Sequence, residues 1–256
     1  MHIEATFLGT GTSQGVPIIG CDCPVCRSLD FRDKRLRTSI HFSINGKSIV
    51  IDSGPDFRQQ MLQNYIHDLD ALIFTHEHQD HVAGLDDVRP INYLRDKDIP
   101  IYASAQVRAR LEKAFHYVFA TEKYPGAPRI QLHQIDNSPF EAAGVLFTPI
   151  EVMHYKLPVL GFRIGDFTYI TDANFIAESE QEKIKGSKVL VLNALRQREH
   201  LSHFTLEEAL ELIEKLQPER AFLTHISHQM GKHAEISEQL PAHVQLAYDG
   251  LKVMSS

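Results

Sequence analysis

The chain reads Thr75-His76-Glu77-His78-Gln79-Asp80-His81 directly after the apolar stretch 69–74. The apolar stretch predicts a buried strand, and the extended segment that leaves a strand sends alternate side chains to one side. The first two imidazoles and the aspartate are therefore expected to converge, with the last imidazole on the helix that follows. This density of donors indicates a centre with two metal ions rather than one.

The sequence of the stretch 75–81 leaves two questions open, which metal it binds and whether it binds one at all. Imidazole and carboxylate ligands suit Zn, Mn or Fe, and spacing alone does not choose the element. A polar loop with an accidental cluster of histidines is the alternative, but buried histidines are usually isolated and hydrogen-bonded. We therefore favour the metal centre.

Length and composition predict one globular unit of the α/β class. The chain has 256 residues, of which 43% are hydrophobic, and this is enough for one substantial core. It shows no Gly/Ser-rich linker, no low-complexity run and no repeat at the period of a solenoid. We expect residues 1–256 to form a single domain.

Charge and hydropathy limit the partners. The formal net charge is -7, which argues against stable binding of nucleic acid, because phosphate backbones are bound through Lys and Arg. The start lacks a basic leader, and no apolar run reaches the ~18 residues of a membrane span. We expect a cytoplasmic protein that avoids membranes and takes a small anionic substrate.

The apolar and polar patterns predict strands in both halves of the chain and helices between them. Asn45-Gly46 predicts a tight hairpin turn, and Thr205 with Glu208 predicts a capping box at the start of an amphipathic helix. The expected strands are 3–8, 38–44, 47–51, 100–103, 145–150, 160–164, 167–170, 189–192 and 221–224, and the expected helices are 84–94, 105–119 and 205–216.

Further polar residues follow predicted strands in the way that the histidine-rich stretch follows its own. His154 lies beyond the strand 145–150, Asp172 follows Tyr169-Ile170, and His225 follows Phe222-Leu223. In this order, the residues resemble the ligands of the metallo-β-lactamase superfamily, and the resemblance covers nearly the whole chain. It implies a four-layer αββα sandwich with metal ligands on the loops along one edge.

The resemblance also implies how the ligands divide between two divalent metals. His76, His78 and His154 would hold one ion, Asp80, His81 and His225 would hold the other, and Asp172 would bridge them. Asp52 matches a further motif, in which an aspartate behind the ligands orients them. A plain turn or helix-cap role for Asp52 remains the alternative, because Ser53-Gly54-Pro55 is also good turn sequence.

The three cysteines form the array Cys21-Asp22-Cys23-Pro24-Val25-Cys26, within a loop at residues 20–27. A disulfide would leave one thiol over and is disfavoured in a reducing compartment. We predict a structural zinc held by Cys21, Cys23, Cys26 and, as the fourth ligand, His228.

Several segments narrow the resemblance to phosphoribosyl cyclic phosphate phosphodiesterases of the carbon-phosphorus lyase pathway. These segments are Gly9-Thr10-Gly11, 14–17, the cysteine array, 223–229 and Tyr248-Asp249-Gly250. The resemblance implies hydrolysis of a ribose cyclic phosphate by a metal-bridging hydroxide. The catalytic metals stay open between Zn, Mn and possibly Fe. The resemblance also suggests a homodimer.

The same resemblance suggests His203 as the acid that protonates the departing ribose oxygen. His200 is the alternative acid, a helix-entry role is the alternative for His203, and Lys156 is a candidate phosphate contact. The stretch 191–196 departs from the family pattern, so the substrate contacts are expected to differ.

Three other functions stay open. A tRNA 3'-processing nuclease shares the histidine motif but needs a basic arm that this sequence lacks. A thioesterase or lactonase would use the same centre on a carbonyl carbon. An accessory protein similar to that of pyrroloquinoline quinone synthesis is the non-enzymatic alternative, although such relatives often lose ligands that are kept here.

Overall fold

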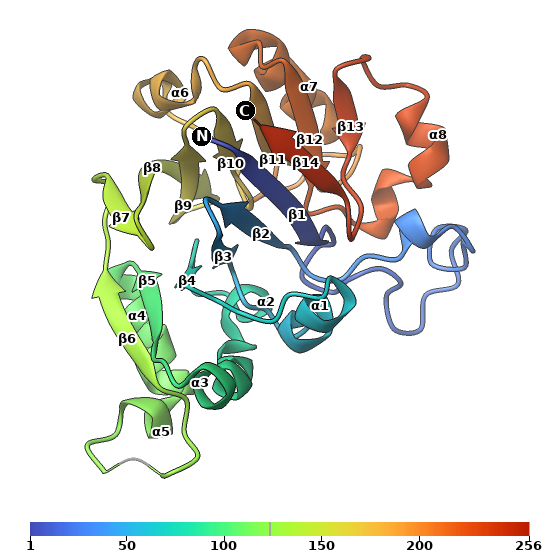
Figure 1. Ribbon diagram of the computed structural model, residues 1–256. Helices are drawn as coiled ribbons and strands as arrows, with labels where there is room; N and C mark the ends of the chain where they lie inside the picture. The colour runs from blue at the N-terminus through green and yellow to red at the C-terminus, as the bar shows by residue number, and fades with distance from the viewer. Residues whose placement is uncertain (123, 256) are drawn as a thin grey trace.

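Two mixed β-sheets form the centre of the protein in the computed structural model, which describes residues 1–122 and 124–255. Each sheet has seven strands, and the sheets have the orders β14-β1-β2-β3-β4-β5-β6 and β13-β12-β11-β10-β9-β8-β7 (Figure 1). The first sheet contains β1 (Ile3–Gly9), β2 (Ser39–Ile44), β3 (Lys47–Ile51), β4 (Ala71–Ile73), β5 (Ile99–Ala103), β6 (Ile130–Gln134) and β14 (Lys252–Ser255). The second contains β7 (Phe140–Ala142), β8 (Val145–His154), β9 (Leu157–Ile164), β10 (Phe167–Tyr169), β11 (Val189–Asn193), β12 (Arg220–Thr224) and β13 (Val244–Leu246).

Helices cover the outer face of each sheet. Beside the first sheet lie α1 (Phe57–Gln63), α2 (Gln79–Val82), α3 (Arg89–Arg95), α4 (Ala105–Ala114) and α5 (His116–Phe119) (Figure 1). Beside the second lie α6 (Glu178–Ile184), α7 (Leu206–Leu216) and α8 (His233–Ser237). Three 3-10 turns complete the described elements: η1 (Phe31–Asp33), η2 (Leu85–Val88) and η3 (His228–Met230).

Alternation along the strands produces the layers. In β3, Ile49 and Ile51 pack into the core between the sheets, while Val50 faces the core under the helices. In β11, Val191 packs between the sheets and Leu192 packs under α6 to α8. Because successive side chains point to opposite faces, strands that are apolar throughout are buried on both sides. The predicted αββα sandwich is thereby confirmed.

Two short-range predictions are confirmed in detail. The backbone of Asn45 and Gly46 has φ values of 52° and 77°, as the hairpin turn between β2 and β3 requires. At the start of α7, the Thr205 hydroxyl accepts from the Glu208 amide and the Glu208 carboxylate accepts from the Thr205 amide. The helix α7 therefore runs from Leu206 to Leu216, and Thr205, the first residue of the expected helix, is its N-cap.

Two expected helices are each divided in two. The segment 84–94 forms η2 and then α3, which has Pro90 in its first turn, where a missing N–H costs no helical hydrogen bond. The segment 105–119 breaks at Phe115, whose φ of -119° is not helical, and this break lets Phe115 and Phe119 both pack against the core below the first sheet. The expected strand 145–150 is longer, because β8 continues through His154.

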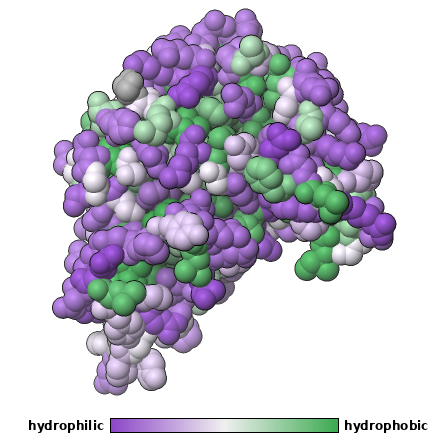
Figure 2. Space-filling model, turned by 45° about the vertical axis from the view of Figure 1, so that its right-hand side comes forward, coloured by the Kyte–Doolittle hydropathy of each residue, from purple (hydrophilic) through white to green (hydrophobic). Residues whose placement is uncertain are grey.

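The surface in Figure 2 is mostly hydrophilic, with hydrophobic groups scattered over it in small clusters. Within residues 1–122 and 124–255, no helix has the length and apolar composition that crossing a bilayer requires.

Candidate metal centre

The candidate ligands lie where strands of both sheets end. His76 follows β4, His154 is the last residue of β8, Asp172 follows β10, and His225 follows β12. Asp172 and His225 have positive φ values of 56° and 56°, and Asp52 after β3 has a φ of 65°. A backbone in the left-handed region is uncommon for residues other than glycine and tends to occur at functional sites. At these three positions, the turn brings a polar side chain towards the same edge.

His81 lies at the centre of three carboxylates. Its Nδ1 is 2.7 Å from Asp52, and its Nε2 is 3.2 Å from Asp80 and 3.3 Å from Asp172. Burial opposes a charge on this imidazole, but the carboxylates of Asp172, Asp80 and Asp52 together raise its pKa well above the ordinary value. Three acidic groups in a buried setting require nearby positive charge.

The His81 ring also has a donor atom left over. Nδ1 is taken by Asp52, while the buried Nε2 has no hydrogen bond of good geometry within the described residues. An imidazole whose one nitrogen is fixed by a carboxylate, and whose other nitrogen faces further carboxylates without a hydrogen bond, is a typical metal ligand. The donor set and this orphaned nitrogen therefore fit a divalent cation.

Asp172 is shared between two groups of donors. One group contains His76, His81 and Asp172, and the other contains His154, Asp172 and His203; within each group the donor atoms lie within 4.8 Å of one another. The Asp172 carboxylate is also 3.1 Å from His225 Nδ1. Burial would raise the pKa of Asp172, but His225 and His81 hold it well below its usual range. This central position is compatible with the bridging role expected from the sequence.

The remaining imidazoles converge on the same place. The rings of His76 and His78 have centroids 4.6 Å apart, and those of His78 and His154 are 5.1 Å apart. His154 Nδ1 donates to the Ser202 carbonyl oxygen at 2.8 Å, which leaves Nε2 for a ligand. The structure thus brings all seven predicted ligands of the catalytic centre together. Their division between two metals stays a prediction. The structure groups His76 with His81, whereas the expected division assigns these two residues to different metals.

Asp52 connects two of the ligands. Its carboxylate accepts from His81 Nδ1 at 2.7 Å and from the Thr75 amide and hydroxyl at 2.9 and 2.8 Å. Because the Thr75 hydroxyl donates to Asp52, it accepts from His76 Nδ1, at 2.9 Å. Asp52 therefore fixes the orientation of His81 directly and that of His76 through Thr75. It also occupies the turn after β3, so its turn position is observed and its role in orienting ligands stays a prediction that these bonds support.

His203 lies inside this cluster. Its Nδ1 is 3.8 Å from Asp172, and its ring centroid is 4.6 Å from that of His154 and 4.7 Å from that of His225. Burial, followed by the neighbouring His225, lowers the pKa of His203 to about 2. Thr205 caps the helix instead, so the helix-entry interpretation of His203 has no support. Its role as an acid stays a prediction.

The two other candidate substrate contacts lie differently. His200 has its ring centroid 5.1 Å from that of His203, so it borders the cluster. Lys156 instead places its Nζ over the ring of Tyr155, 5.2 Å from the centroid. Within the described residues, we find no contact of Lys156 with a predicted ligand.

The cysteine cluster forms a second group of donors. His228 Nδ1 is 3.4 Å from Cys21 Sγ, 3.3 Å from Cys23 Sγ and 3.7 Å from Cys26 Sγ. A tetrahedral zinc, with bonds of about 2.3 Å to sulfur and about 2.0 Å to nitrogen, separates these atoms by about 3.5 Å. Burial would raise the pKa of Cys23, but hydrogen bonds from the Cys26 amide and His228 lower it to about 6. The four predicted residues thus meet the requirements of a closed zinc site.

The sequence reasoning missed two positioning residues. Thr75 is the first residue of the stretch 75–81. Its hydroxyl lies next to the candidate ligand His76 in the sequence, and this position could have indicated its role. Asn193 ends the apolar strand β11, and its side chain amide bonds both backbone groups of Ala173, at 2.7 and 2.8 Å. It thereby braces the turn that carries Asp172. Asn193 lies in the stretch 191–196 that departs from the family pattern.

Comparisons with known proteins find similar sequences and similar folds. A family model described as a beta-lactamase superfamily domain matches residues 47–226. An octanoyltransferase from Porphyromonas gingivalis is 44% identical over 255 residues, which are 98% of this chain and 51% of that protein. The chain thus spans about half the length of this curated relative.

Two solved structures are similar along their whole length. A diphosphatase of the PhnP family superimposes with a TM-score of 0.94 at 40% identity, covering 100% of this chain and 98% of that one. Zinc-bound PqqB from Methylobacterium extorquens superimposes with a TM-score of 0.80 at 19% identity, covering 99% of each chain, and so shares the fold.

Proposed function

This chain belongs to the metallo-β-lactamase superfamily and resembles its PhnP family, and we propose that it is a metal-dependent phosphodiesterase acting on small phosphodiesters. The observation that carries the proposal is the gathering of the seven predicted ligands around Asp172, in a chain 40% identical from end to end to a diphosphatase. Hydrolysis of a diphosphate and of a cyclic phosphodiester both break a bond between phosphorus and one oxygen leaving group, after attack on that phosphorus. The same centre can therefore act on either.

The residues that would hold two divalent ions are the seven ligands predicted from the sequence: His76, His78, Asp80, His81, His154, Asp172 and His225. Bound there, Zn or Mn would lower the pKa of a coordinated water and stabilise negative charge on phosphoryl oxygens. Cys21, Cys23, Cys26 and His228 would hold a structural zinc.

The chain's own residues supply orientation and a proton. Asp52 and Thr75 hold His81 and His76 in fixed orientations, so that the centre is organised before the substrate binds. His203 Nδ1 lies 3.8 Å from Asp172 and, although it is buried, has no hydrogen bond within the described residues. We assign to it the transfer of a proton to the departing oxygen.

Among small phosphodiesters, we propose a ribose 1,2-cyclic phosphate as the substrate. Support comes from the sequence segments shared with the cyclic phosphodiesterases and from the similarity to the PhnP-family structure. The net charge of -7 disfavours an extended nucleic acid as the substrate.

The test is a comparison of substrates with protein loaded with Mn or Zn. The panel contains ribose 1,2-cyclic phosphate 5-phosphate, a 2',3'-cyclic nucleotide, a dinucleotide with a diphosphate bridge and a bis-aryl phosphodiester, with Asp80→Ala as control. We expect the ribosyl cyclic phosphate to give the highest kcat/KM, and the control to be inactive. If the diphosphate alone is hydrolysed, the proposal of a metal-dependent hydrolase stands, but the proposal of a cyclic phosphate substrate is wrong.

One observation favours a second candidate function. The relative that is 44% identical is named an octanoyltransferase, and octanoyl transfer involves an acyl ester or thioester. The match covers 51% of that protein, so its name does not place the activity in the matched half. Adding an octanoyl thioester to the substrate panel separates the two: turnover confined to the thioester would replace the phosphodiesterase by a thioesterase.

A further inference from the structure

Two sequence segments that the proposed function does not use, 9–11 and 248–250, meet at the carboxylate of Asp249. Its Oδ1 accepts from the amide and the hydroxyl of Thr10, at 2.9 and 2.8 Å, and its Oδ2 accepts from the Leu36 amide at 2.6 Å. These donors lie 239 and 213 positions away along the chain. One carboxylate therefore holds three distant parts of the chain together.

The buried side chain of Arg35 also holds Thr10. Its Nη1 donates to the Thr10 hydroxyl at 2.7 Å and to the Ala247 carbonyl at 2.6 Å, and its Nη2 lies 3.2 Å from His233 Nδ1. A hydroxyl has one donor and two acceptor positions, so that of Thr10 donates to Asp249 while it accepts from Arg35. Both bonds involve a charged group, and such bonds are roughly twice as strong as bonds between neutral groups.

Thr10 is fixed beside the short segment that carries one histidine of each metal cluster. The Ile226 amide donates to the Thr10 carbonyl at 2.8 Å, and the Thr12 amide donates to the Ile226 carbonyl at 3.1 Å. Ile226 directly follows the candidate catalytic ligand His225 and precedes the candidate zinc ligand His228 by two positions. These two bonds therefore fix the backbone that carries both histidines.

Gly11 lets the chain pack closely at this point. It pairs in parallel with Arg37 and with Ile226. A Cβ at Gly11 would lie 2.9 Å from the Arg35 carbonyl oxygen, which is closer than Cβ atoms come in proteins. Glycine is therefore required for this close approach.

The backbone of Arg35 holds the start of the cysteine loop. The Val16 amide donates to the Arg35 carbonyl at 2.9 Å, and the Arg35 amide donates to the Val16 carbonyl at 2.7 Å. Two residues further on, the Ile18 amide donates to Cys26 Sγ at 3.4 Å, and the Ile18 carbonyl accepts from the Cys21 amide at 3.0 Å. The same network thus reaches the cysteine cluster as well.

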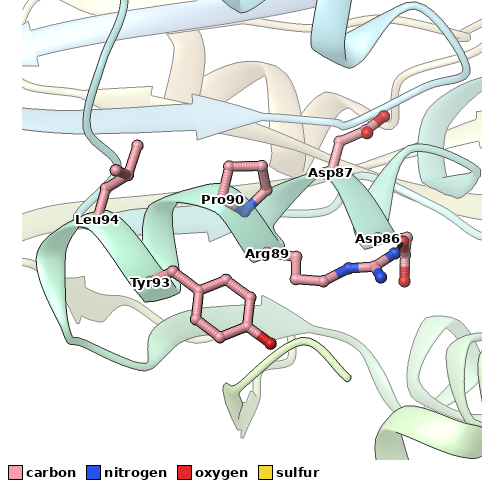
Figure 3. Close-up of a pocket in the computed structure, with 6 residues that line it drawn as sticks. All are labelled: Asp86, Asp87, Arg89, Pro90, Tyr93 and Leu94. Carbon is pink, nitrogen blue, oxygen red and sulfur yellow. Dashed lines mark ion pairs between the residues drawn. The ribbon is translucent and has the colours of Figure 1, made fainter. Parts of the chain in front are cut away.

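An ion pair at the surface shows the contrast. In a cavity of about 490 Å³ over α3, the Arg89 guanidinium extends towards Asp86 and forms an ion pair with it (Figure 3). Asp86 also accepts from the Tyr117 hydroxyl. The ion pair joins residues only three positions apart, and neither of them belongs to a metal cluster. Asp86 is therefore an aspartate with similar bonds that supports neither cluster.

We propose that Asp249 is a positioning residue for both candidate metal sites. By holding Thr10, it fixes the two backbone bonds to Ile226. Those bonds set the places of His225 and His228 relative to their partner donors. His225 needs such support, because its φ of 56° lies in the left-handed region, which is costly for a residue other than glycine. The inference rests on the metal-dependent function proposed above and extends it to a residue outside both sites.

The experiment titrates metal-free wild type, Asp249→Asn and the matched control Asp86→Asn with Co(II), in competition with a chelator. The thiolate-to-cobalt absorption band follows the cysteine cluster, and the remaining bound cobalt follows the catalytic centre. Whichever way the new amide turns, its nitrogen faces another donor. We therefore expect Asp249→Asn to lose about tenfold in affinity at both sites. Asp86→Asn should bind cobalt as the wild type does.

Three results would overturn the inference. They are equal affinities in Asp249→Asn and wild type, a loss at one site alone, and an equal loss in Asp86→Asn. A merely structural role would lower the free energy of unfolding and leave both affinities unchanged, so this pattern also counts against positioning.

A second pair of variants decides the question if Asp249→Asn does not fold. Thr10→Val removes the hydroxyl that joins Asp249 to Arg35 and should lower both affinities about fivefold, the effect of one hydrogen bond. Thr10→Ser keeps the hydroxyl and should restore them, whereas equal affinities in the two variants would reject the inference. If the wild type hydrolyses no phosphodiester, the proposed substrate class fails, and the cobalt titration still decides the role of Asp249.

Discussion

The strand-end cluster around Asp172 and the cysteine cluster around His228 differ in almost every physical respect. The first gathers donors from both sheets, contains buried carboxylates and has an orphaned nitrogen on His81. The second has four donors from one loop and one turn, with every Sγ within 3.7 Å of His228 Nδ1. Zinc sites closed by four protein ligands are structural, whereas catalytic sites keep a position for water or substrate.

From these differences, we expect the two clusters to respond differently to mutation. At the strand-end cluster, the charge of the ligands and a coordination position left for water or substrate should control turnover. At the cysteine cluster, the cross-link that a zinc ion makes between the loop and the turn should control stability.

Removing the shared carboxylate should have the largest effect. Asp172→Asn keeps the shape of the side chain but loses the charge that both donor groups share. We expect activity to fall by at least about a thousandfold, because the charge that holds the metals is lost. Elemental analysis should show that the metal of the cysteine cluster is retained. Loss of all metal in this variant would break the separation between the clusters.

Removing the candidate acid should have the next largest effect. His203→Ala should lower kcat by about 100-fold to 10,000-fold, the range for general acid catalysis. Metal content should be unchanged, since we do not count His203 among the ligands. A wild-type rate would reject the acid role, and loss of one metal equivalent would make His203 a ligand instead.

The cysteine cluster should respond in stability. Cys23→Ser should lose one zinc equivalent and lower the free energy of unfolding by about 2–5 kcal/mol, as when a covalent cross-link is removed. Denaturant titration and elemental analysis measure the two effects. Unchanged metal content would remove the zinc assignment from this cluster.

A matched pair of threonines tests the orientation of the ligands. Thr75→Val breaks the connection from Asp52 to His76 and should lower activity about tenfold. Thr224 precedes His225 as Thr75 precedes His76, yet its buried hydroxyl has no hydrogen bond within the described residues. Thr224→Val should therefore keep wild-type activity. Equal effects of the two substitutions would show that packing, rather than orientation, matters.

A buried histidine outside both clusters, His41, should make the free energy of unfolding depend on pH. Burial lowers the pKa of His41 from 6.5 to about 4. Because the unfolded chain takes up this proton first, stability present above pH 6.5 is lost as the pH falls towards 4. Between pH 7 and 5.5, wild type should lose about 1 kcal/mol more than His41→Gln in denaturant titrations. An equal loss in both proteins would contradict this assignment.

Much of the fold could be predicted because it depends on local patterns. Apolar strands, the Asn45-Gly46 turn and the Thr205 capping box each have a signature within a few residues. The ligands could be found because each polar residue interrupts or follows an apolar strand. The pairing of β14 with β1 could not be predicted, since it joins residues 252–255 to residues 3–6 and nothing local encodes it.

The supporting residues were harder to predict for the same reason. Thr75 and Asn193 act through bonds to Asp52 and Ala173, which are brought near only by the fold. The Arg196 guanidinium likewise donates a hydrogen bond to Gln229, 33 positions away along the chain. Sequence shows which chemistry is present, but the orientation of ligands and the choice of substrate depend on such distant contacts.

The most direct test of the account is a titration of metal-free protein with Zn, in which bound metal and phosphodiesterase activity are both measured at each step. We predict that the first equivalent fills the closed cysteine site and produces no activity. The second and third equivalents should then produce it. Full activity at one equivalent, or saturation of the protein at one, would contradict the account of one structural site and a separate two-metal catalytic centre.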